Sequence, residues 1–463
     1  MIPNSVTKID NYAFSHCSGF NSVNLSKNMT EINDYVFEYC TGLLNLTLPE
    51  NIELIRSYAF TYCSGIKGSL TIPDTITNIE SYAFSFCTGI TNINFGRGMK
   101  NIDSFVFSNC EGLTNLTIPG WITSIGSYSF TYCSRIRGTL IIPDNVLQVG
   151  NGAFSFCSGL TDIKMSQNNV FRSCIGITNL TIPEWITTLK SFCFSYCNGI
   201  RGTLIIPDTI LHLGSSSFTY CSRINNIVFS SNVKEIPSNC FSYCTGLVTL
   251  TIPEWIIAIR SNAFSYCSGI RGRLTIPDSV RVIDSSAFSH CTGFTSLKLS
   301  QNITLINDHV FEYCSNLATL TIPDTVTYIG DNAFSYCSRI VGSITISDSV
   351  KTIDKSAFSH CICATSINFG KNLTEISSNA FEYCSGVSSL TIPNWITTIR
   401  SNAFQYCTGI KGTLTISDSV TRIESSAFSH CSNFTDLIIS KKLTVINENV
   451  FEYCLCLASL TIP

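Results

Sequence analysis

The sequence is poor in charged residues. Asp, Glu, Lys and Arg make up 13% of its 463 residues, against roughly 25% in average proteins. The net charge is only -3 at pH 7, and no run of like charges stands out. The chain therefore lacks the basic surface that nucleic acids and acidic membranes attract, and we expect neither as a partner.

Long apolar runs are also missing. No stretch approaches the ~18 apolar residues that span a bilayer, so we expect no membrane insertion within this chain. The first residues, Met1 to Val6, have neither the basic nor the apolar part of a secretory signal and instead match the interior of a unit seen again at residues 275–280. Residues 460–463 also stop inside such a unit. Because solenoids need polar capping units, we expect an array that is truncated mid-repeat at both ends.

One motif is abundant: Phe-x-x-Cys, with an apolar residue three places further on. Its twenty copies begin at Phe14, Phe37, Phe60, Phe84, Phe107, Phe130, Phe154, Phe171, Phe194, Phe218, Phe241, Phe264, Phe288, Phe311, Phe334, Phe358, Phe381, Phe404, Phe428 and Phe451. Almost every step is 23 or 24 residues. Such a period predicts a solenoid, in which each unit buries its apolar face against its neighbours. We expect a single solenoid of about twenty coils over residues 1–463.

Each unit contains one clear strand signal. In the unit of Phe241, Leu250 and Ile252 flank Thr251, an alternation of period two that is typical of a strand. Pro253 follows and should end the strand, because proline has no N–H for a ladder. Stacked units would align these strands as one parallel sheet. A Val/Ile-x-x-Ile pattern predicts a second short extended segment, and the stretch leading to the Cys is interpreted as a turn of helix.

The repeat Leu-Thr-Ile-Pro-x-x-Val-x-x-Ile-x-x-x-Ala-Phe-x-x-Cys, seen for example in residues 250–267, resembles the BspA-like type of leucine-rich repeat. That family occurs in bacterial surface proteins and in some parasitic protists. The resemblance covers the whole chain and implies an α/β-type leucine-rich-repeat horseshoe with a parallel β-sheet on one face. It also implies display at the cell surface or outside the cell, with host or matrix proteins as ligands. Because no signal peptide is visible, a cytoplasmic location stays open.

A period of 70 residues lies on top of the shorter one, so that three unit types alternate. The first type often carries Ser or Gly where the others have Pro, and the third type contains an inserted Gly. One step, from Phe154 to Phe171, is only 17 residues long. Alignment of residues 300–311 with residues 166–171 shows that this shortened repeat has lost one apolar segment. We expect a kink or a thin spot there.

Cysteine is frequent, with 24 residues, and twenty of them occupy the slot three after the Phe, from Cys17 to Cys454. The other four are Cys193, Cys240, Cys363 and Cys456. Equivalent positions in stacked coils form one column, and free Cys packs as a small buried hydrophobe. We therefore predict a reduced, buried ladder, with disulfides between adjacent coils as the alternative. Zinc is disfavoured because the motif lacks closely paired ligands.

No residue pattern points to catalysis. Four histidines share one slot with aromatic residues such as Phe86, Phe156 and Tyr220, which favours aromatic packing over metal binding or acid-base chemistry. They are His16, His290, His360 and His430. No Gly-rich phosphate loop, Ser-His-Asp arrangement or close carboxylate pair occurs. We predict no enzyme activity, no cofactor and no metal.

Two rows of side chains are candidates for a binding surface. Threonines between the two inward strand residues should point outward, and the candidates on this sheet face are Thr117, Thr181, Thr251, Thr275, Thr321 and Thr391. All four tryptophans occupy one rim slot, 14 after the Phe of the second unit type: Trp121, Trp185, Trp255 and Trp395. We expect this slot to be substantially exposed, and exposed Trp is enriched at interfaces. The alternatives are that Thr simply suits a pleated surface and that duplication copied the Trp.

These patterns predict a non-enzymatic protein- or glycan-binding repeat protein, surface-displayed and adhesin-like, that contacts its ligand along the sheet face or the rim. Two other functions stay open. One is an intracellular scaffold or regulatory subunit, and the other is an architectural spacer.

Overall fold

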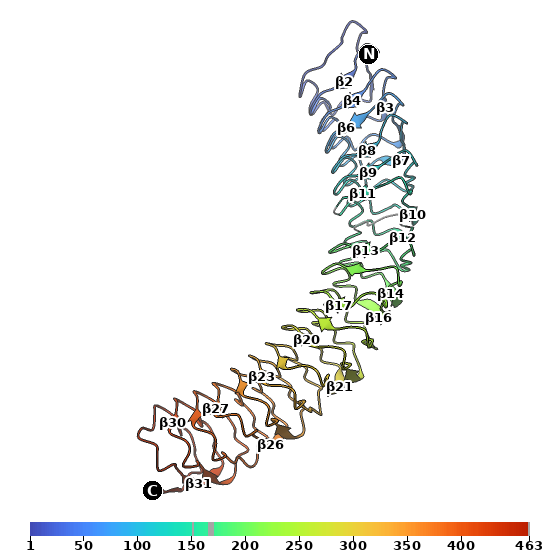
Figure 1. Cartoon of the computed structure of the whole chain (residues 1–463). Coiled ribbons are helices and arrows are strands. Elements are labelled where there is room, and N and C mark those ends of the chain that lie inside the picture. Colours follow the sequence, from blue (N-terminus) through green and yellow to red (C-terminus); the bar gives the residue numbers. More distant parts are fainter. Residues whose placement is uncertain (151, 165–170, 462–463) are drawn as a thin grey trace. The chain divides into compact units, whose positions relative to one another are not determined.

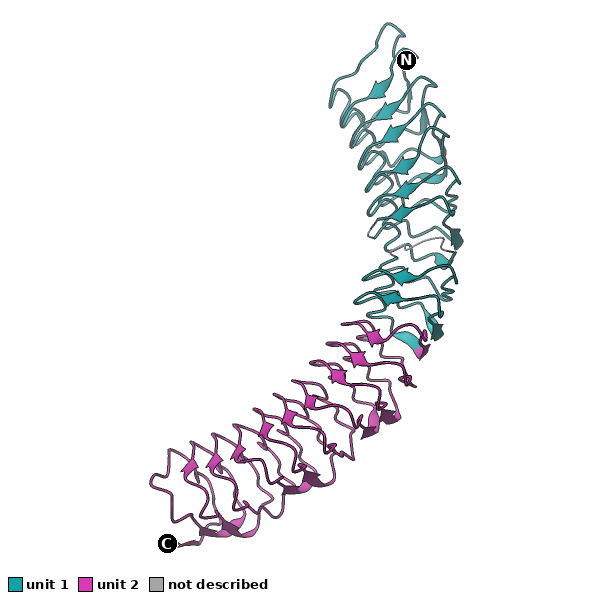
Figure 2. Ribbon diagram, viewed as in Figure 1, with its two compact units in different colours: residues 1–224 teal, residues 225–463 magenta. Residues whose placement is uncertain are grey.

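The computed structural model describes residues 1–150, 152–164 and 171–461 (Figure 1). The chain divides into two compact units, residues 1–224 and 225–463 (Figure 2). Both are parallel β-solenoids, built from about 19 coils in all. That the two units form one continuous solenoid stays a prediction.

The first set of strands, column A, contains the predicted strand segments of the first and third unit types. In residues 1–224 its strands are β1 (Ser22–Asn24), β3 (Asn45–Thr47), β5 (Gly68–Thr71), β7 (Ile90–Asn94), β10 (Gly138–Ile141), β12 (Leu160–Lys164) and β14 (Arg201–Ile205). β16 (Arg223–Val228) crosses the boundary between the units. In residues 225–463 they are β19 (Gly272–Thr275), β21 (Phe294–Lys298), β24 (Gly342–Thr345), β26 (Ala364–Asn368), β29 (Gly412–Thr415), β31 (Phe434–Ile438) and β32 (Ser459–Thr461). Among the described residues of the second unit type, only β3 and β32 are strands, and the segment at residues 250–252, on which the strand was predicted, is not one.

The second set, column B, consists of two-residue strands from the predicted Val/Ile-x-x-Ile segments. In residues 1–224 they are β2 (Glu31–Ile32), β4 (Leu54–Ile55), β6 (Asn78–Ile79), β8 (Asn101–Ile102), β9 (Ser124–Ile125), β11 (Gln148–Val149), β13 (Thr188–Leu189) and β15 (His212–Leu213). In residues 225–463 they are β17 (Glu235–Ile236), β18 (Ala258–Ile259), β20 (Val282–Ile283), β22 (Leu305–Ile306), β23 (Tyr328–Ile329), β25 (Thr352–Ile353), β27 (Glu375–Ile376), β28 (Thr398–Ile399) and β30 (Arg422–Ile423). Within each unit, columns A and B lie on opposite sides of the coils (Figure 1).

The prediction of one uninterrupted sheet is wrong in detail. Column A is mostly made of parallel pairs such as β5 with β7, where Leu70 is opposite Ile93 and Thr71 is opposite Asn94. Five of these pairs, β5–β7, β10–β12, β19–β21, β24–β26 and β29–β31, contain a bulge beside the inserted glycine, as between Gly68 and Ser69. The bulge shifts the hydrogen-bond register of this strand. Elsewhere in column A the pairing between coils is reduced to isolated bridges, such as that of Ser296 with Thr319. Column B forms sheets of up to three strands, one strand from each coil of a 70-residue block.

The stretch around each core Phe is a series of turns, so the predicted turn of helix is wrong. Tyr58, Phe60 and Tyr62 donate their backbone N–H groups to carbonyls of the next coil at 2.8–3.2 Å, whereas the N–H groups of Thr61 and Cys63 bond back within the turn. Tyr58 and Tyr62 both have a φ of 60°. This left-handed conformation is excluded from a right-handed helix.

No helix occurs among the described residues, so the α/β description and the horseshoe implied by the resemblance are not confirmed. It follows that no described segment is a helix long and apolar enough to cross a bilayer. In place of a helix, each coil has a series of turns around its core Phe, and the backbone hydrogen bonds of these turns alternate between the next coil and the same coil.

Stacked phenylalanines form the centre of the core. Phe60 and Phe84 are fully buried, and their ring centroids lie 5.2 Å apart. The stack continues across the shortened repeat, where the rings of Phe154 and Phe171 are 6.1 Å apart and inclined by 24°. The place where the sequence has lost its apolar segment, residues 166–170, lies outside the described residues, so the expected kink or thin spot stays a prediction. The core column is therefore retained although this coil is six residues shorter.

Candidate binding surface

The predicted threonine row is exposed. Its members in the second and third unit types are Thr47, Thr71, Thr117, Thr181, Thr251, Thr275, Thr321, Thr345, Thr391 and Thr415, and all ten are solvent-accessible. Five of the ten lie in column A strands, and there the alternation is the cause: in β19 the side chain of Leu274 is fully buried, so that of Thr275 points to the opposite, outward side. The threonines at this slot therefore present hydroxyl groups to solvent from coil after coil in each unit.

Polar neighbours extend this face. In the first unit, Asn94 donates its side-chain N–H to Thr71 Oγ1 at 3.2 Å, and Asn92 donates to Ser69 Oγ at 3.2 Å. In the second unit Asn368 donates in the same way to Thr345 Oγ1 at 3.3 Å. These bonds link adjacent coils and hold the side chains in rows, while further donor and acceptor positions on the same groups still face solvent.

The rim tryptophans differ in exposure. Trp185 is 65% exposed and Trp255 is 37% exposed, whereas Trp121 and Trp395 are half-buried. The expected exposure is therefore too high for Trp121 and Trp395.

For Trp121, Trp255 and Trp395, the indole lies against the preceding coil, which limits its exposure. Trp121 Nε1 donates to the carbonyl oxygen of Gly96 at 3.1 Å, Trp255 to that of Ser230 at 2.9 Å, and Trp395 to that of Gly370 at 2.9 Å. Each acceptor occupies the position where the first unit type has Ser or Gly in place of Pro. The small residue and the Trp thus form a packing pair, so the recurrence of Trp at this slot has in part a structural explanation.

A hollow joins the two candidate rows at one place in the first unit. It has a volume of about 420 Å³ and is lined by Asp162, Ile163, Lys164, Thr181, Pro183 and Trp185. Thr181 belongs to the sheet-face row and Trp185 to the rim, and Asp162 and Lys164 come from β12. An exposed indole beside hydroxyl, carboxylate and ammonium groups can stack on a ring and hydrogen-bond its substituents.

A family model for the BspA-type leucine-rich-repeat region matches the chain in residues 1–68, 67–169, 167–271, 271–387 and 351–463. The chain belongs to this family. A search of curated protein sequences finds no match. The chain is also similar to the crystal structure of a leucine-rich-repeat protein from Bacteroides ovatus, with a TM-score of 0.59 and 23% identity, covering 81% of this chain and 87% of that one. A leucine-rich cell-surface protein from Faecalibacterium prausnitzii gives a TM-score of 0.45 and 28% identity, covering 63% of this chain and 83% of that one. The first of these likenesses establishes the leucine-rich-repeat fold.

The cysteine column of this BspA-type chain is structural. The described column cysteines are not joined in disulfides, and those between the first and last coils are buried. A typical member, Cys267, donates its Sγ–H to the carbonyl oxygen of Phe241 in the preceding coil at 3.1 Å. Burial raises the pKa of Cys40 to about 11 and that of Cys110 to about 12. The predicted burial is confirmed, and these thiols are poor nucleophiles because the thiolate is suppressed.

The histidine slot is an aromatic packing position, as predicted. In the second unit His290 lies between the rings of Tyr266 and Tyr313, with centroids 4.2 and 4.5 Å away. Burial lowers the pKa of His290, although Glu312 opposes this shift. In residues 1–150, 152–164 and 171–461, no group of three or more His, Cys, Asp or Glu side chains is placed to hold a metal ion.

The structure also reveals two left-handed columns that the sequence analysis missed. The residues two before and two after each core Phe have φ near 60° in almost every coil. A signal was available, because Asn recurs two before the Phe, as at Asn262 and Asn332, and Asn tolerates this conformation better than most residues.

Proposed function

We propose that this chain is a non-enzymatic binding protein that holds an extended ligand on the outward face of column A. A surface-displayed, adhesin-like role, as the family resemblance implies, is part of the proposal. The family and the fold are those of repeat proteins that generally serve as binding scaffolds, and the exposed Thr, Ser and Asn rows are uncharged over most of their length. Such a surface suits a ligand that offers many weak hydrogen bonds rather than one charged group.

The observation that carries the proposal is the hollow at Trp185. It combines the most exposed indole of the four with Thr181, Asp162 and Lys164 in one concave site. A pyranose ring has an apolar face for the indole and hydroxyl groups for the three polar side chains. Between the two ligand classes, protein and glycan, the hollow favours a glycan.

The test is affinity electrophoresis of the full chain through gels containing neutral polysaccharides, followed by calorimetry with the retarding glycan. We expect Trp185→Thr to weaken binding at least tenfold, because it removes the indole that would stack on the sugar ring. The variant should fold, because Thr already occupies the same slot at Thr325. Thr181→Val removes one hydroxyl and should weaken binding several-fold. Thr321→Val is the matched control, since it changes the corresponding threonine in the other compact unit, and Thr321 does not line the hollow.

Equal affinity of the wild-type chain and Trp185→Thr for the glycan would remove the hollow from the site. If no neutral glycan binds while an extracellular-matrix protein does, the ligand class is protein. An antibody against the chain that stains only permeabilised cells would refute surface display.

A further inference from the structure

A second hollow in the first unit lies where a column of stacked rings is interrupted. The exposed aromatic column consists of the residues two after each core Phe. Tyr132 and Phe156 stack in it with centroids 4.4 Å apart, as do Tyr196 and Tyr220 at 4.5 Å. The coil between Phe156 and Tyr196 contributes Ser173 instead of a ring. The hollow there has a volume of about 540 Å³ and is lined by Tyr128, Ser155, Phe156, Arg172, Ser173, Ile175, Tyr196 and Asn198.

At this slot Ser173 replaces a ring, but its backbone has the same conformation as the ring-bearing residues. Ser173 has a φ of 59°, as the ring-bearing residues do. Phe156 donates its N–H to the Ser173 carbonyl at 3.1 Å, and Ser173 donates to the Ser195 carbonyl at 2.7 Å. Phe156 and Tyr196 are therefore two coils apart, which at ~4.8 Å per strand spacing is about 9.6 Å. Neighbouring rings of this column lie 4.1–4.6 Å apart, so the gap matches one planar ring.

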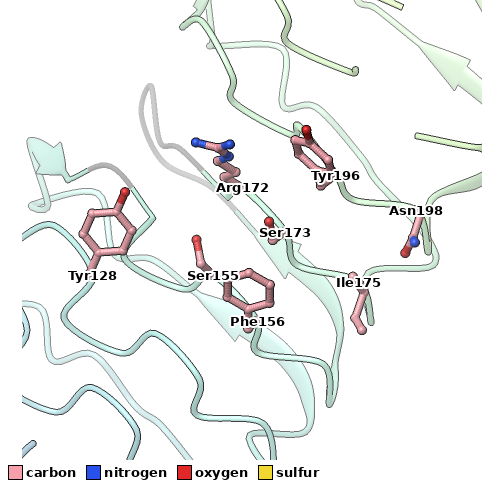
Figure 3. A pocket seen from close by; sticks show the side chains of 8 residues that line it. All are labelled: Tyr128, Ser155, Phe156, Arg172, Ser173, Ile175, Tyr196 and Asn198. Atoms are coloured by element: carbon pink, nitrogen blue, oxygen red, sulfur yellow. The ribbon is translucent and has the colours of Figure 1, made fainter. Parts of the chain in front are cut away.

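The two rings that border the gap are accessible. Phe156 is 42% exposed and Tyr196 is 40% exposed. Figure 3 shows Ser173 between them, with Arg172 beside Ser173 on the same turn. A ligand ring inserted above Ser173 would thus find an aromatic ring on each side and a small hydroxyl side chain below it.

Arg172 gives the hollow a positive charge. Its guanidinium carbon lies 5.5 Å from the ring centroid of Tyr196 and 5.7 Å from that of Phe192. No Asp or Glu lines the hollow, and no carboxylate in the described part of the chain forms an ion pair with Arg172. A planar guanidinium pairs best with a carboxylate.

We propose that this hollow is a binding slot for a small planar aromatic carboxylate. The ligand ring completes the interrupted stack between Phe156 and Tyr196, and its carboxylate pairs with Arg172. A second interruption of the same column, at Asn109, lacks this charge because Ser108 stands where Arg172 stands. Asn109 therefore provides an internal comparison for a gap without the cation.

The test is calorimetric titration of the full chain with 2-naphthoate, 2-naphthol and cyclohexanecarboxylate. We expect 2-naphthoate to bind at least tenfold more tightly than either of the others, since it alone is both planar and anionic. Ser173→Tyr should weaken 2-naphthoate binding at least tenfold by filling the gap. Arg172→Gln should bring the affinities for 2-naphthoate and 2-naphthol close together. Asn109→Tyr is the control and should leave both affinities unchanged.

Ser173→Tyr should fold, because Tyr132 and Tyr196 occupy the same slot with φ near 60°. Should it not fold, Ser173→His serves instead, because His290 fills the same slot with a stacked ring and a φ of 61°. The proposal is overturned if the wild-type chain shows no saturable 2-naphthoate binding, if the filled variant binds as well as wild type, or if Asn109→Tyr weakens binding equally.

Discussion

Replacement of one core phenylalanine should test whether the ring column, rather than apolar burial alone, stabilises the coils. Phe264 is fully buried, and its ring lies 5.6 Å from that of Phe241 and 5.4 Å from that of Phe288. Phe264→Ala should lower the free energy of unfolding by about 3–5 kcal/mol, the usual loss for a buried Phe. Phe264→Leu keeps most of the apolar volume but removes two ring pairs worth about 0.5–1.5 kcal/mol each. We therefore expect the leucine variant to lose about 1–3 kcal/mol.

The assay is urea unfolding followed by circular dichroism, combined with amide hydrogen exchange. In a repeat array each coil contacts only its neighbours, so lost exchange protection should centre on the coils of Phe241, Phe264 and Phe288. Tyr266→Leu is the control, because Tyr266 is 36% exposed and stacks in the outer column. It should cost less than Phe264→Leu. If Phe264→Leu costs well below about 1 kcal/mol while Phe264→Ala costs about 3–5 kcal/mol, apolar burial alone explains what the coil gains from Phe264 and the ring stack does not contribute. A loss below about 1 kcal/mol for Phe264→Ala would refute the assignment of this column as core.

Three further predictions follow from the turns, thiols and surface charges. Gly138→Ala should cost about 1–2 kcal/mol in thermal or urea unfolding, because Gly138 has a φ of 80° and an added Cβ meets nothing, so only backbone strain acts; Gly120→Ala, also in open space but without a positive φ, is the control and should be neutral. Thiol titration at pH 8 should modify few of the 24 cysteines before denaturation and most of them afterwards. Because burial raises the thiol pKa values in the folded state, the thiol contribution to the free energy of unfolding should be constant below about pH 8 and fall as pH rises from about 9 through 11–12. A flat stability profile over that range would contradict the buried ladder. Arg260→Gln should cost at most about 1 kcal/mol, and less at 1 M salt, since the Arg260–Glu235 pair at 2.9 Å is more than a third exposed; an undiminished cost at high salt would show that lost packing, not charge, is responsible.

The sequence alone determined the repeat, the burial pattern and the outward threonines. Every coil supplies Phe, Cys and most often an alternating pair of apolar residues at equivalent positions, so one periodic pattern was enough to place Phe241, Cys244 and Leu250 inward or nearly so and Thr251 outward. The aromatic packing role of His290 followed in the same way, because Phe and Tyr occupy its slot in other coils.

Only the tertiary structure decided the path of the turns and the places where columns break. The left-handed conformation of Tyr58 and Tyr62 depends on backbone bonds to the next coil, which local propensity does not report. Trp121 is half-buried because its indole reaches a carbonyl 25 residues earlier in the chain. Likewise, the gap at Ser173 becomes a hollow only because Phe156 and Tyr196 stand one coil before it and one coil after it. Each of these features is a contact between coils, and its geometry is fixed by stacking rather than by sequence period.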